Sequence, residues 1–141
     1  MFNQILIPVD LTHKEHLERL RQAAQLLIDG VGSVTLLYVD PIMVHRDALM
    51  MELEESQFDE HRQEAQAQLQ SLSESLQLEN VTMNVVTREG VAHDQILEYA
   101  SEISADAILM MASQPGVSSY FIGSTAERVV RHADCSVFVI R

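Results

Sequence analysis

The residues with the clearest potential for chemistry lie near the end of the chain, at Gly123-Ser124-Thr125. They follow the apolar run Ala107–Met111 and a turn of small residues at 113–119, and they open a segment with helical spacing that ends at His132. The first N–H groups of a helix are unpaired and carry the positive end of its dipole. A glycine lets a ligand approach the backbone, and the two hydroxyls can donate to phosphate oxygens. This arrangement predicts an anion pocket, although a helix cap that binds nothing has the same composition.

Other polar residues allow both a chemical and a structural interpretation. Asp10 follows the first apolar strand, where it could meet a ligand or cap the next helix. His13 and His16 share one helical face and could bind a metal, but no third ligand is in view, so surface histidines are the favoured interpretation. His132 and Cys135 lie where a helix passes into the last strand, which favours a dipole contact and a packed thiol over nucleophilic chemistry.

Apolar periodicity predicts five strands that alternate with four helices. The strands are predicted at Phe2–Val9, Ser33–Val39, Val81–Thr87, Ala107–Met111 and Ser136–Ile140. The first helix is expected over His13–Asp29, capped by Asp10 or Thr12 and ended by Gly30 and Gly32. The connection at 41–60 is expected to become a helix that is clear by about His61 and buries residues as far as Leu76. The remaining helices are expected over Ala92–Ser104 and Gly123–His132, with Arg88-Glu89-Gly90 as a turn.

This alternation indicates an α/β fold with one five-stranded parallel sheet and helices on both of its faces, a Rossmann-like architecture. The strand runs are continuously apolar, as expected for strands that are covered on both sides. Ligands of such sheets bind beyond the carboxyl ends of the strands. The segments expected there are 10–12, 39–40, the turn at Gly90 and the turn at 113–119. The topology therefore points to the same place as Gly123-Ser124-Thr125.

Length and composition limit the class of protein. The 141 residues predict a single domain over 1–141 that is long enough to bury a core. No apolar run approaches the length of a membrane span, and the N-terminal residues lack the pattern of a signal peptide. The single cysteine, Cys135, fits a reducing compartment. We therefore expect a cytoplasmic protein without membrane insertion.

The net charge is −12, with 21 acidic and 9 basic residues, and Lys14 is the only lysine. Binding to nucleic acid requires basic surfaces, so this charge argues against a nucleic-acid partner. It also opposes anionic ligands in general, so a phosphate site must be local and strong.

Several motifs resemble the universal stress protein family over the whole chain. They are Ile5-Leu-Ile-Pro-Val-Asp10, Val34-Thr-Leu-Leu-Tyr-Val-Asp40-Pro41, Glu89-Gly90 and the long segment Gly123–Ile140. The turn with Pro115 and the approach Tyr120-Phe-Ile-Gly123 resemble the short bacterial F- and G-type members. The resemblance implies a Rossmann-like domain of the adenine-nucleotide α-hydrolase type. It also implies a homodimer formed through the last strand, Val137–Ile140.

Many members of this family bind ATP, so the resemblance implies an adenine-nucleotide site for ATP, AMP or ADP, with Mg²⁺ beside the phosphates. Asp10 would lie near the ribose or the metal, the backbone of Val39 near the adenine, and Gly123 and Ser124 at the phosphates. The candidate nucleotide-binding residues are Pro8, Val9, Asp10, Val39, Ser113, Gln114, Gly123, Ser124 and Thr125. Met111 and Gln114 stand where nucleotide-binding members carry two glycines.

Three functional interpretations follow. The first is a regulatory dimer in a stress response that binds ATP or a related nucleotide. The second is a nucleotide-free dimer that acts through an unknown protein partner, which Met111 and Gln114 favour. The third is an enzyme that slowly hydrolyses ATP or modifies itself, but no residue stands out as a general base, so the sequence names no catalytic residue.

Overall fold

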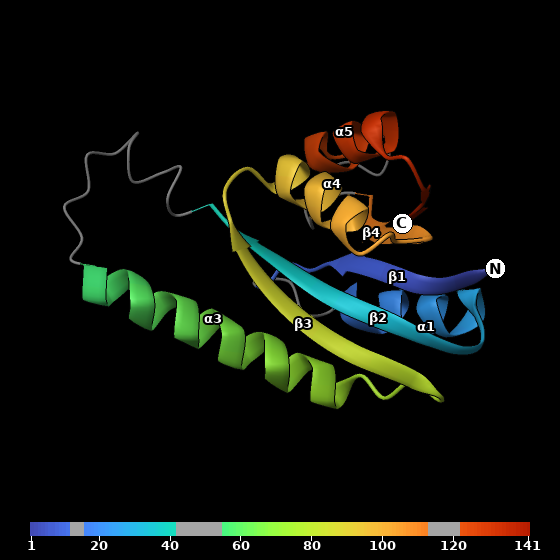
Figure 1. Cartoon of the computed structure of the whole chain (residues 1–141), viewed down its shortest axis with the longest axis horizontal. Coiled ribbons are helices and arrows are strands. Elements are labelled where there is room, and N and C mark those ends of the chain that lie inside the picture. Colours follow the sequence, from blue (N-terminus) through green and yellow to red (C-terminus); the bar gives the residue numbers. More distant parts are fainter. Residues whose placement is uncertain (12–15, 42–54, 113–121) are drawn as a thin grey trace.

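The computed structural model describes residues 1–11, 16–41, 55–112 and 122–141 (Figure 1). Its five strands are β1 (Phe2–Pro8), β2 (Ile28–Asp40), β3 (Val81–Glu89), β4 (Ala107–Met111) and β5 (Ser136–Ile140). They form one sheet in the order β3-β2-β1-β4-β5, and every neighbouring pair is parallel. The helices are α1 (Leu17–Leu27), α3 (Glu55–Ser75), α4 (Ala92–Glu102) and α5 (Ser124–His132). The predicted α/β class and parallel sheet are confirmed.

Helices cover both faces of the sheet, because successive strand residues point to opposite sides. Ile5, Ile7 and Leu36 belong to the core on one face, where residues of α1 and α3 pack against them. Leu6, Leu37 and Ile108 belong to the second core, where residues of α4 and α5 pack. The expected buried positions of α3 are found, with Ala65, Leu69 and Leu76 buried and Leu72 partly buried. Strands buried on both faces explain the continuous apolar runs.

The first helix ends earlier than predicted, and the second strand begins earlier. Helix α1 ends at Leu27, and β2 starts at Ile28, which is extended and pairs with Phe2. Gly30 and Gly32 therefore lie inside the strand instead of ending the helix, and Gly30 has a φ of +85° where the ladder shifts register. At its start, α1 has His16 as the flanking residue, with no capping hydrogen bond from a side chain. A cap at Asp10 or Thr12 stays a prediction, since residues 12–15 lie outside the described part.

The limits of β3 and α4 also differ from the sequence prediction. Arg88 and Glu89, expected in a turn, are the last residues of β3 because they pair with Val39 and Asp40. Helix α3 begins at Glu55, within the segment expected to become a helix, whereas α4 ends at Glu102, short of the predicted Ser104.

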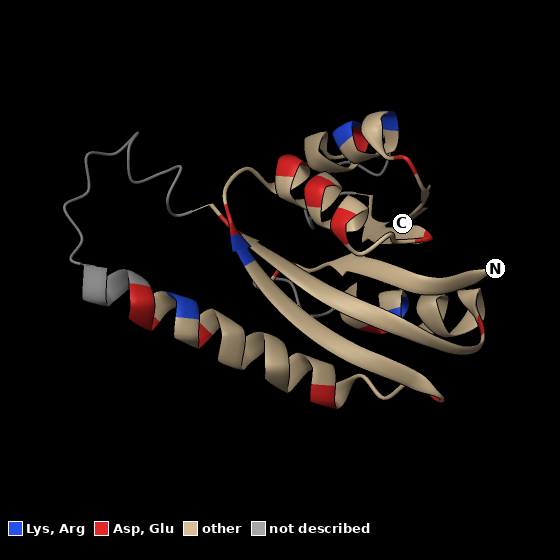
Figure 2. Ribbon diagram, viewed as in Figure 1, with Lys and Arg blue, Asp and Glu red and all other residues tan. Residues whose placement is uncertain are grey.

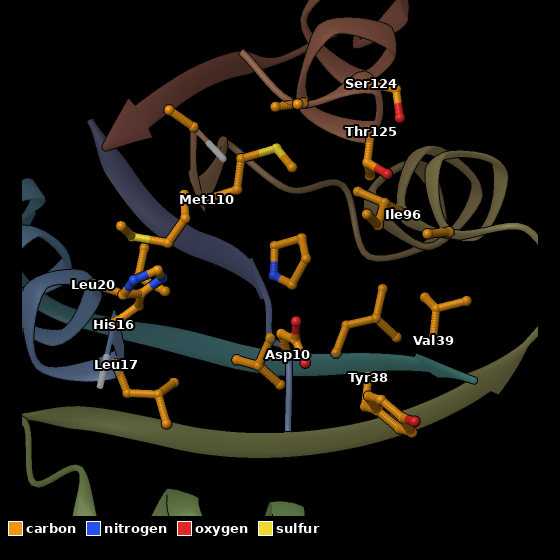
Figure 3. Close-up of a pocket in the computed structure, with 18 of the residues that line it drawn as sticks. Asp10, His16, Leu17, Leu20, Tyr38, Val39, Ile96, Met110, Ser124 and Thr125 are labelled. Carbon is orange, nitrogen blue, oxygen red and sulfur yellow. The ribbon is translucent and has the colours of Figure 1, made fainter. Parts of the chain in front are cut away.

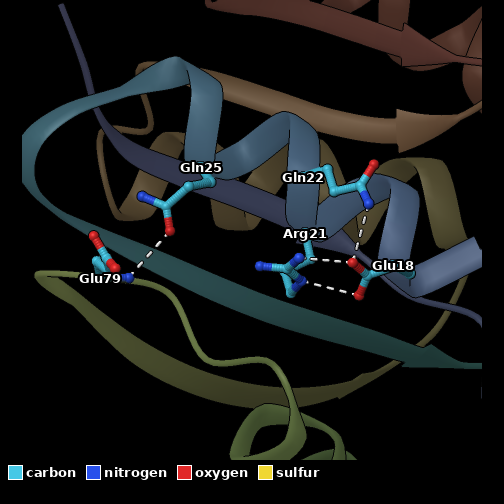
Figure 4. A network of polar contacts seen from close by, with 5 residues as sticks. All are labelled: Glu18, Arg21, Gln22, Gln25 and Glu79. Atoms are coloured by element: carbon cyan, nitrogen blue, oxygen red, sulfur yellow. Dashed lines mark hydrogen bonds and ion pairs between the residues drawn. The ribbon is translucent and has the colours of Figure 1, made fainter.

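Polar contacts join segments that are far apart in the sequence. The carboxylate Oδ2 of Asp106 accepts hydrogen bonds from the N–H groups of Asn3 and Gln4, each at 2.9 Å, just before β4 begins. On α1, Arg21 contacts both carboxylate oxygens of Glu18 at 2.9 and 2.6 Å and thereby lowers the pKa of this exposed carboxyl (Figure 4). Nearby, the N–H of Glu79 donates to Gln25 Oε1 at 3.1 Å, which ties α1 to the segment before β3 (Figure 4).

Charged residues lie mainly on the helices and at the strand ends (Figure 2). Acidic residues recur along α4, where Glu98 and Glu102 lie 3.7 and 2.5 Å from the guanidinium of Arg88. Arg88 also stacks over the ring of Tyr99, with 4.8 Å from its Cζ to the ring centroid. Across the described ranges, no helix is both long and apolar enough to cross a membrane.

Candidate functional site

A pocket of about 620 Å³ opens at the carboxyl ends of the central strands (Figure 3). Strands β1, β2 and β4 contribute their ends, and helices α1, α4 and α5 contribute their first turns. The side chains that face it are mostly apolar. Its lining residues are Pro8, Val9, Asp10, His16, Leu17, Leu20, Leu37, Tyr38, Val39, Pro41, Ala92, Ile96, Met110, Met111, Ala112, Gly123, Ser124, Thr125 and Ala126. The pocket therefore lies where the topology predicts a ligand.

The strand ends position the polar residue Asp10. Pro8 is the last residue of β1, and the N–H of Val9 still donates to the carbonyl of Leu37 at 2.9 Å. Asp10 comes directly after this last bond between the strands, so its backbone is anchored next to the end of β2. Figure 3 shows Asp10 among the labelled side chains around the pocket. A carboxylate held there is suited to accept hydrogen bonds from hydroxyl groups or to face a cation.

Helix α5 begins at the opposite wall. Gly123 is its N-cap, with φ −59° and ψ 154°, and makes no side-chain cap. The N–H of Gly123 donates to the carbonyl of Ala112 at 2.6 Å, which fixes the helix start beside the end of β4. Ser124 and Thr125 follow, and both line the pocket. The first N–H groups of α5 and its two hydroxyls therefore offer donors to an anion.

Two more helices begin at the same pocket. Residues before and within the first turn of α1 line it, and so does Ala92, the first residue of α4. Three macrodipoles thus place their positive ends around one space. This arrangement offsets part of the unfavourable field of a protein with a net charge of −12.

The ionisable side chains among the described lining residues are Asp10, His16 and Tyr38. Burial, together with the nearby charges of Asp40 and Asp10, raises the pKa of Tyr38 above its usual value of 10.0. The phenol is therefore neutral at physiological pH and can donate a hydrogen bond. Its neighbour Asp40 is 2% exposed, and Asp40 Oδ2 lies 2.8 Å from Nε2 of His61 on α3.

The structure brings together seven of the nine residues proposed from the sequence. Pro8, Val9, Asp10 and Val39 lie on the strand side of the pocket, and Gly123, Ser124 and Thr125 lie on the α5 side. Ser113 and Gln114 lie outside the described residues. This common location is a structural fact, whereas a nucleotide-binding role for these residues stays a prediction.

His16 lies in a place that the sequence did not predict. The sequence favoured a surface histidine, and His16 is partly exposed and lines the pocket (Figure 3). Its position directly before an apolar helical face was the available signal. Its proposed metal partner, His13, lies outside the described residues. Within the described part of the chain, no three His, Cys, Asp or Glu residues are grouped so that they could hold a metal ion.

The last two reactive residues do not reach the pocket lining. His132 is exposed in the last turn of α5, where a cation is favourable, as expected. Cys135 packs against the second core, and burial raises the pKa of its thiol. The reading of Cys135 as a packed thiol is confirmed.

Known proteins resemble this chain in sequence and fold. The model of the Universal stress protein family matches residues 1–141. Universal stress protein G of Shigella flexneri is 30% identical over 146 aligned residues, covering 100% of both chains. The crystal structure of the hypothetical protein PH0823 is 28% identical with a TM-score of 0.78, covering 99% of this chain and 96% of that one. The universal stress protein from Archaeoglobus fulgidus in complex with dAMP shares the fold, with a TM-score of 0.64 at 17% identity over 99% of this chain and 98% of that one. The match of the family model to the whole length of this chain shows that it belongs to the universal stress protein family.

Proposed function

We propose that this chain is a regulatory protein that binds an adenine nucleotide, ATP or the related AMP and ADP, in the pocket at the carboxyl ends of its strands. The observation that carries the proposal is the pocket itself, which joins apolar walls to donor groups at the start of α5. The complex of the Archaeoglobus fulgidus relative with dAMP supports an adenine ligand for this fold. We also propose a role in a stress response, which membership of the universal stress protein family supports.

The chemistry of the lining matches the two parts of a nucleotide. The two faces of a purine ring are flat and apolar, and the side chains of Val9, Leu37 and Ile96 provide apolar walls that can pack against them. We place the adenine against the backbone of Val39, whose N–H and carbonyl can form hydrogen bonds with the polar edge of the base. The phosphates belong at Gly123, Ser124 and Thr125, where unpaired N–H groups and hydroxyls converge.

Asp10 would accept hydrogen bonds from the ribose hydroxyls or face a magnesium ion. Magnesium is held in proteins by one or two carboxylates together with phosphates of the ligand and water. A single carboxylate is therefore enough for an ion that arrives with ATP. Magnesium should accordingly strengthen binding of ATP and leave binding of adenosine unchanged.

The test is calorimetric titration of the purified, nucleotide-stripped protein with ATP, with and without magnesium. Gly123→Val should abolish binding, because its side chain would occupy the approach to the first N–H groups of α5. Valine can adopt the dihedral angles of Gly123, φ −59° and ψ 154°, so the fold should persist and can be checked by circular dichroism. Binding that survives in folded Gly123→Val would remove the proposed phosphate site.

A matched pair of serine variants separates local from general effects. Ser124 lines the pocket at the start of α5, whereas Ser101 is exposed near the end of α4. Ser124→Ala should weaken ATP binding by roughly ten- to a hundredfold, the effect of one hydrogen bond to a charged group. Ser101→Ala should bind as the wild type does.

Binding, without turnover, is the proposed activity. Single-turnover incubation with labelled ATP should show no phosphate release or label transfer beyond that of Ser124→Ala. Release that depends on Ser124 would instead establish a slow hydrolase.

A second candidate is a nucleotide-free protein that acts through contact with a partner protein. Met111 favours it, because this side chain lines the pocket at a position where nucleotide-binding members of the family carry a glycine. A well-folded protein that binds no adenine nucleotide would support this alternative and exclude the first.

We further propose that the protein forms a homodimer through β5. This strand is at one end of the sheet order and pairs only with β4 among the described strands. Its residues Val137–Ile140 are apolar, and such an edge is prone to pair with another strand. The carbonyl of Ile140 accepts from Ala112, so the backbone groups of Ile140 face β4 and those of Val139 face outward.

This alternation provides a selective test. Val139→Pro removes an outward N–H group and leaves the bonds between β4 and β5 in place. Light scattering should give a dimer for the wild type and for Val139→Ala, and a monomer for Val139→Pro. A wild-type monomer at micromolar concentration would contradict the proposed interface.

A further inference from the structure

His16 is an unexpected member of the pocket lining. Of the described residues that line the pocket, it alone carries nitrogen atoms in its side chain. The other polar side chains there are the carboxylate of Asp10 and the hydroxyls of Tyr38, Ser124 and Thr125. An imidazole N–H is therefore a donor of a kind that no other described lining side chain supplies.

The position of His16 is fixed by the helix that follows it. His16 precedes α1 with helical dihedral angles, φ −81° and ψ −15°, and its side chain does not cap that helix. Leu17 and Leu20, the next residues on this side of α1, are 6% and 3% exposed and belong to the core. Because α1 is anchored by these leucines, the imidazole is held toward the pocket (Figure 3).

We propose that His16 contacts the phosphate-bearing part of the bound nucleotide and makes the pocket select phosphorylated nucleosides over the free nucleoside. The inference rests on the proposed nucleotide-binding function. Asp10 and Tyr38 are the other ionisable groups of the described lining, and the Asp10 carboxylate repels a phosphate. An imidazole N–H attracts the phosphate and donates a hydrogen bond to it. His16 thus opposes the effect of Asp10 within the same pocket.

The experiment compares AMP with adenosine by calorimetry, in the wild type, His16→Ala and His132→Ala. His132 provides the matched control, because it is exposed at the far end of α5 from Ser124. His16→Ala should weaken AMP binding about tenfold, the typical effect of losing a hydrogen bond to a charged group, and change adenosine binding less than about twofold. His132→Ala should leave both affinities unchanged.

A second measurement reports contact directly. In protein labelled with ¹⁵N-histidine, the ring nitrogen signals that are missing from His16→Ala should shift on addition of AMP and stay in place on addition of adenosine. A purely structural role for His16 would change both affinities equally and leave the ring signals unmoved by AMP.

The outcomes separate this inference from the proposed function. If the wild type binds AMP and His16→Ala keeps the wild-type ratio of AMP to adenosine affinity, the role of His16 is refuted and the nucleotide site stands. If the folded wild type binds neither AMP nor ATP, the proposed function fails, and the role of His16 fails with it.

Discussion

Replacing Gly32 by alanine should destabilise the fold by about 2 kcal/mol, within the range of roughly 1–3 kcal/mol for overpacking. A Cβ at this position would lie 2.8 Å from the carbonyl oxygen of Asn3 and 3.0 Å from Cγ2 of Ile28. Both distances are shorter than an ordinary van der Waals contact, so a neighbour must move. Gly32 lies on β2 next to the irregular start of the β1–β2 ladder.

The neighbour that must move is restrained. The carbonyl of Asn3 and the N–H of Gln4 belong to one planar peptide group, so they shift together. That N–H donates to Asp106 Oδ2 at 2.9 Å, and the N–H of Asn3 donates to the same oxygen. Relief of the clash therefore strains bonds that tie β1 to the start of β4. Ile28 offers little relief, because it is 6% exposed and packed in the core.

Urea unfolding followed by circular dichroism measures the effect, provided that wild type and variant share the same m-value. A double-mutant cycle with Asp106→Ala then tests the restraint. The cost of Gly32→Ala should fall by about 0.5–1.5 kcal/mol in the Asp106→Ala background, since the Asn3–Gln4 peptide is released. Nucleotide affinity should not change, because Gly32 lies toward the amino end of β2, whereas Leu37 to Val39 line the pocket.

Two results would refute this reasoning at different points. A Gly32→Ala protein within about 0.5 kcal/mol of the wild type would show that the clash is relieved without cost. A cost that is equal with and without Asp106 would show that the clash is real but that Asp106 does not restrain the peptide.

Three further predictions concern stability and reactivity. Leu109→Ala should cost about 3–5 kcal/mol in urea unfolding, because Leu109 is fully buried in the core of the α1 face; a loss below about 1 kcal/mol would contradict that packing. His61→Ala should cost about 1–3 kcal/mol, because the buried carboxylate of Asp40 loses an imidazole at 2.8 Å; an unchanged urea midpoint would mean that the contact contributes nothing. Alkylation of Cys135 by iodoacetamide should reach half its maximal rate at a higher pH in the native protein than in urea, because burial raises the pKa of the thiol and favours its unreactive protonated form; identical pH profiles in mass spectrometry would contradict this.

Much of the fold follows from the sequence, because the strand cores are continuous apolar runs. Ala107–Met111 and Ser136–Ile140 are observed with the predicted bounds, and the alternation of strands and helices correctly implies the parallel sheet. Local patterns fail where tertiary pairing decides. Gly30 and Gly32 are residues typical of a helix end, but the segment around them pairs with β1 and is therefore part of the strand. Arg88 and Glu89 resemble a turn, but their pairing with β2 extends the strand.

The site was partly predictable for the same reason. Asp10 and Gly123-Ser124-Thr125 follow strand ends directly, so the topology alone brings them to one edge of the sheet. His16 was missed because its orientation depends on the burial of Leu17 and Leu20, which sets how α1 rotates over the sheet. The His61–Asp40 contact joins residues 21 positions apart (61 − 40) across two elements, and no local spacing marks such a pair.

The strand order has a consequence for the growing chain on the ribosome. β1 is made first, yet it occupies the centre of the sheet and pairs with both β2 and β4. The first 105 residues contain β1, β2 and β3, which can pair with one another. One edge of the central strand β1 stays unpaired until residues Ala107–Met111 have been made and form β4. Ile5 and Leu6, both fully buried in the finished protein, lie on that edge of the sheet and pair with Ala107 and Ile108. An intermediate of this length exposes an apolar strand edge, which makes late synthesis the stage at which this protein is most open to aggregation and to capture by chaperones.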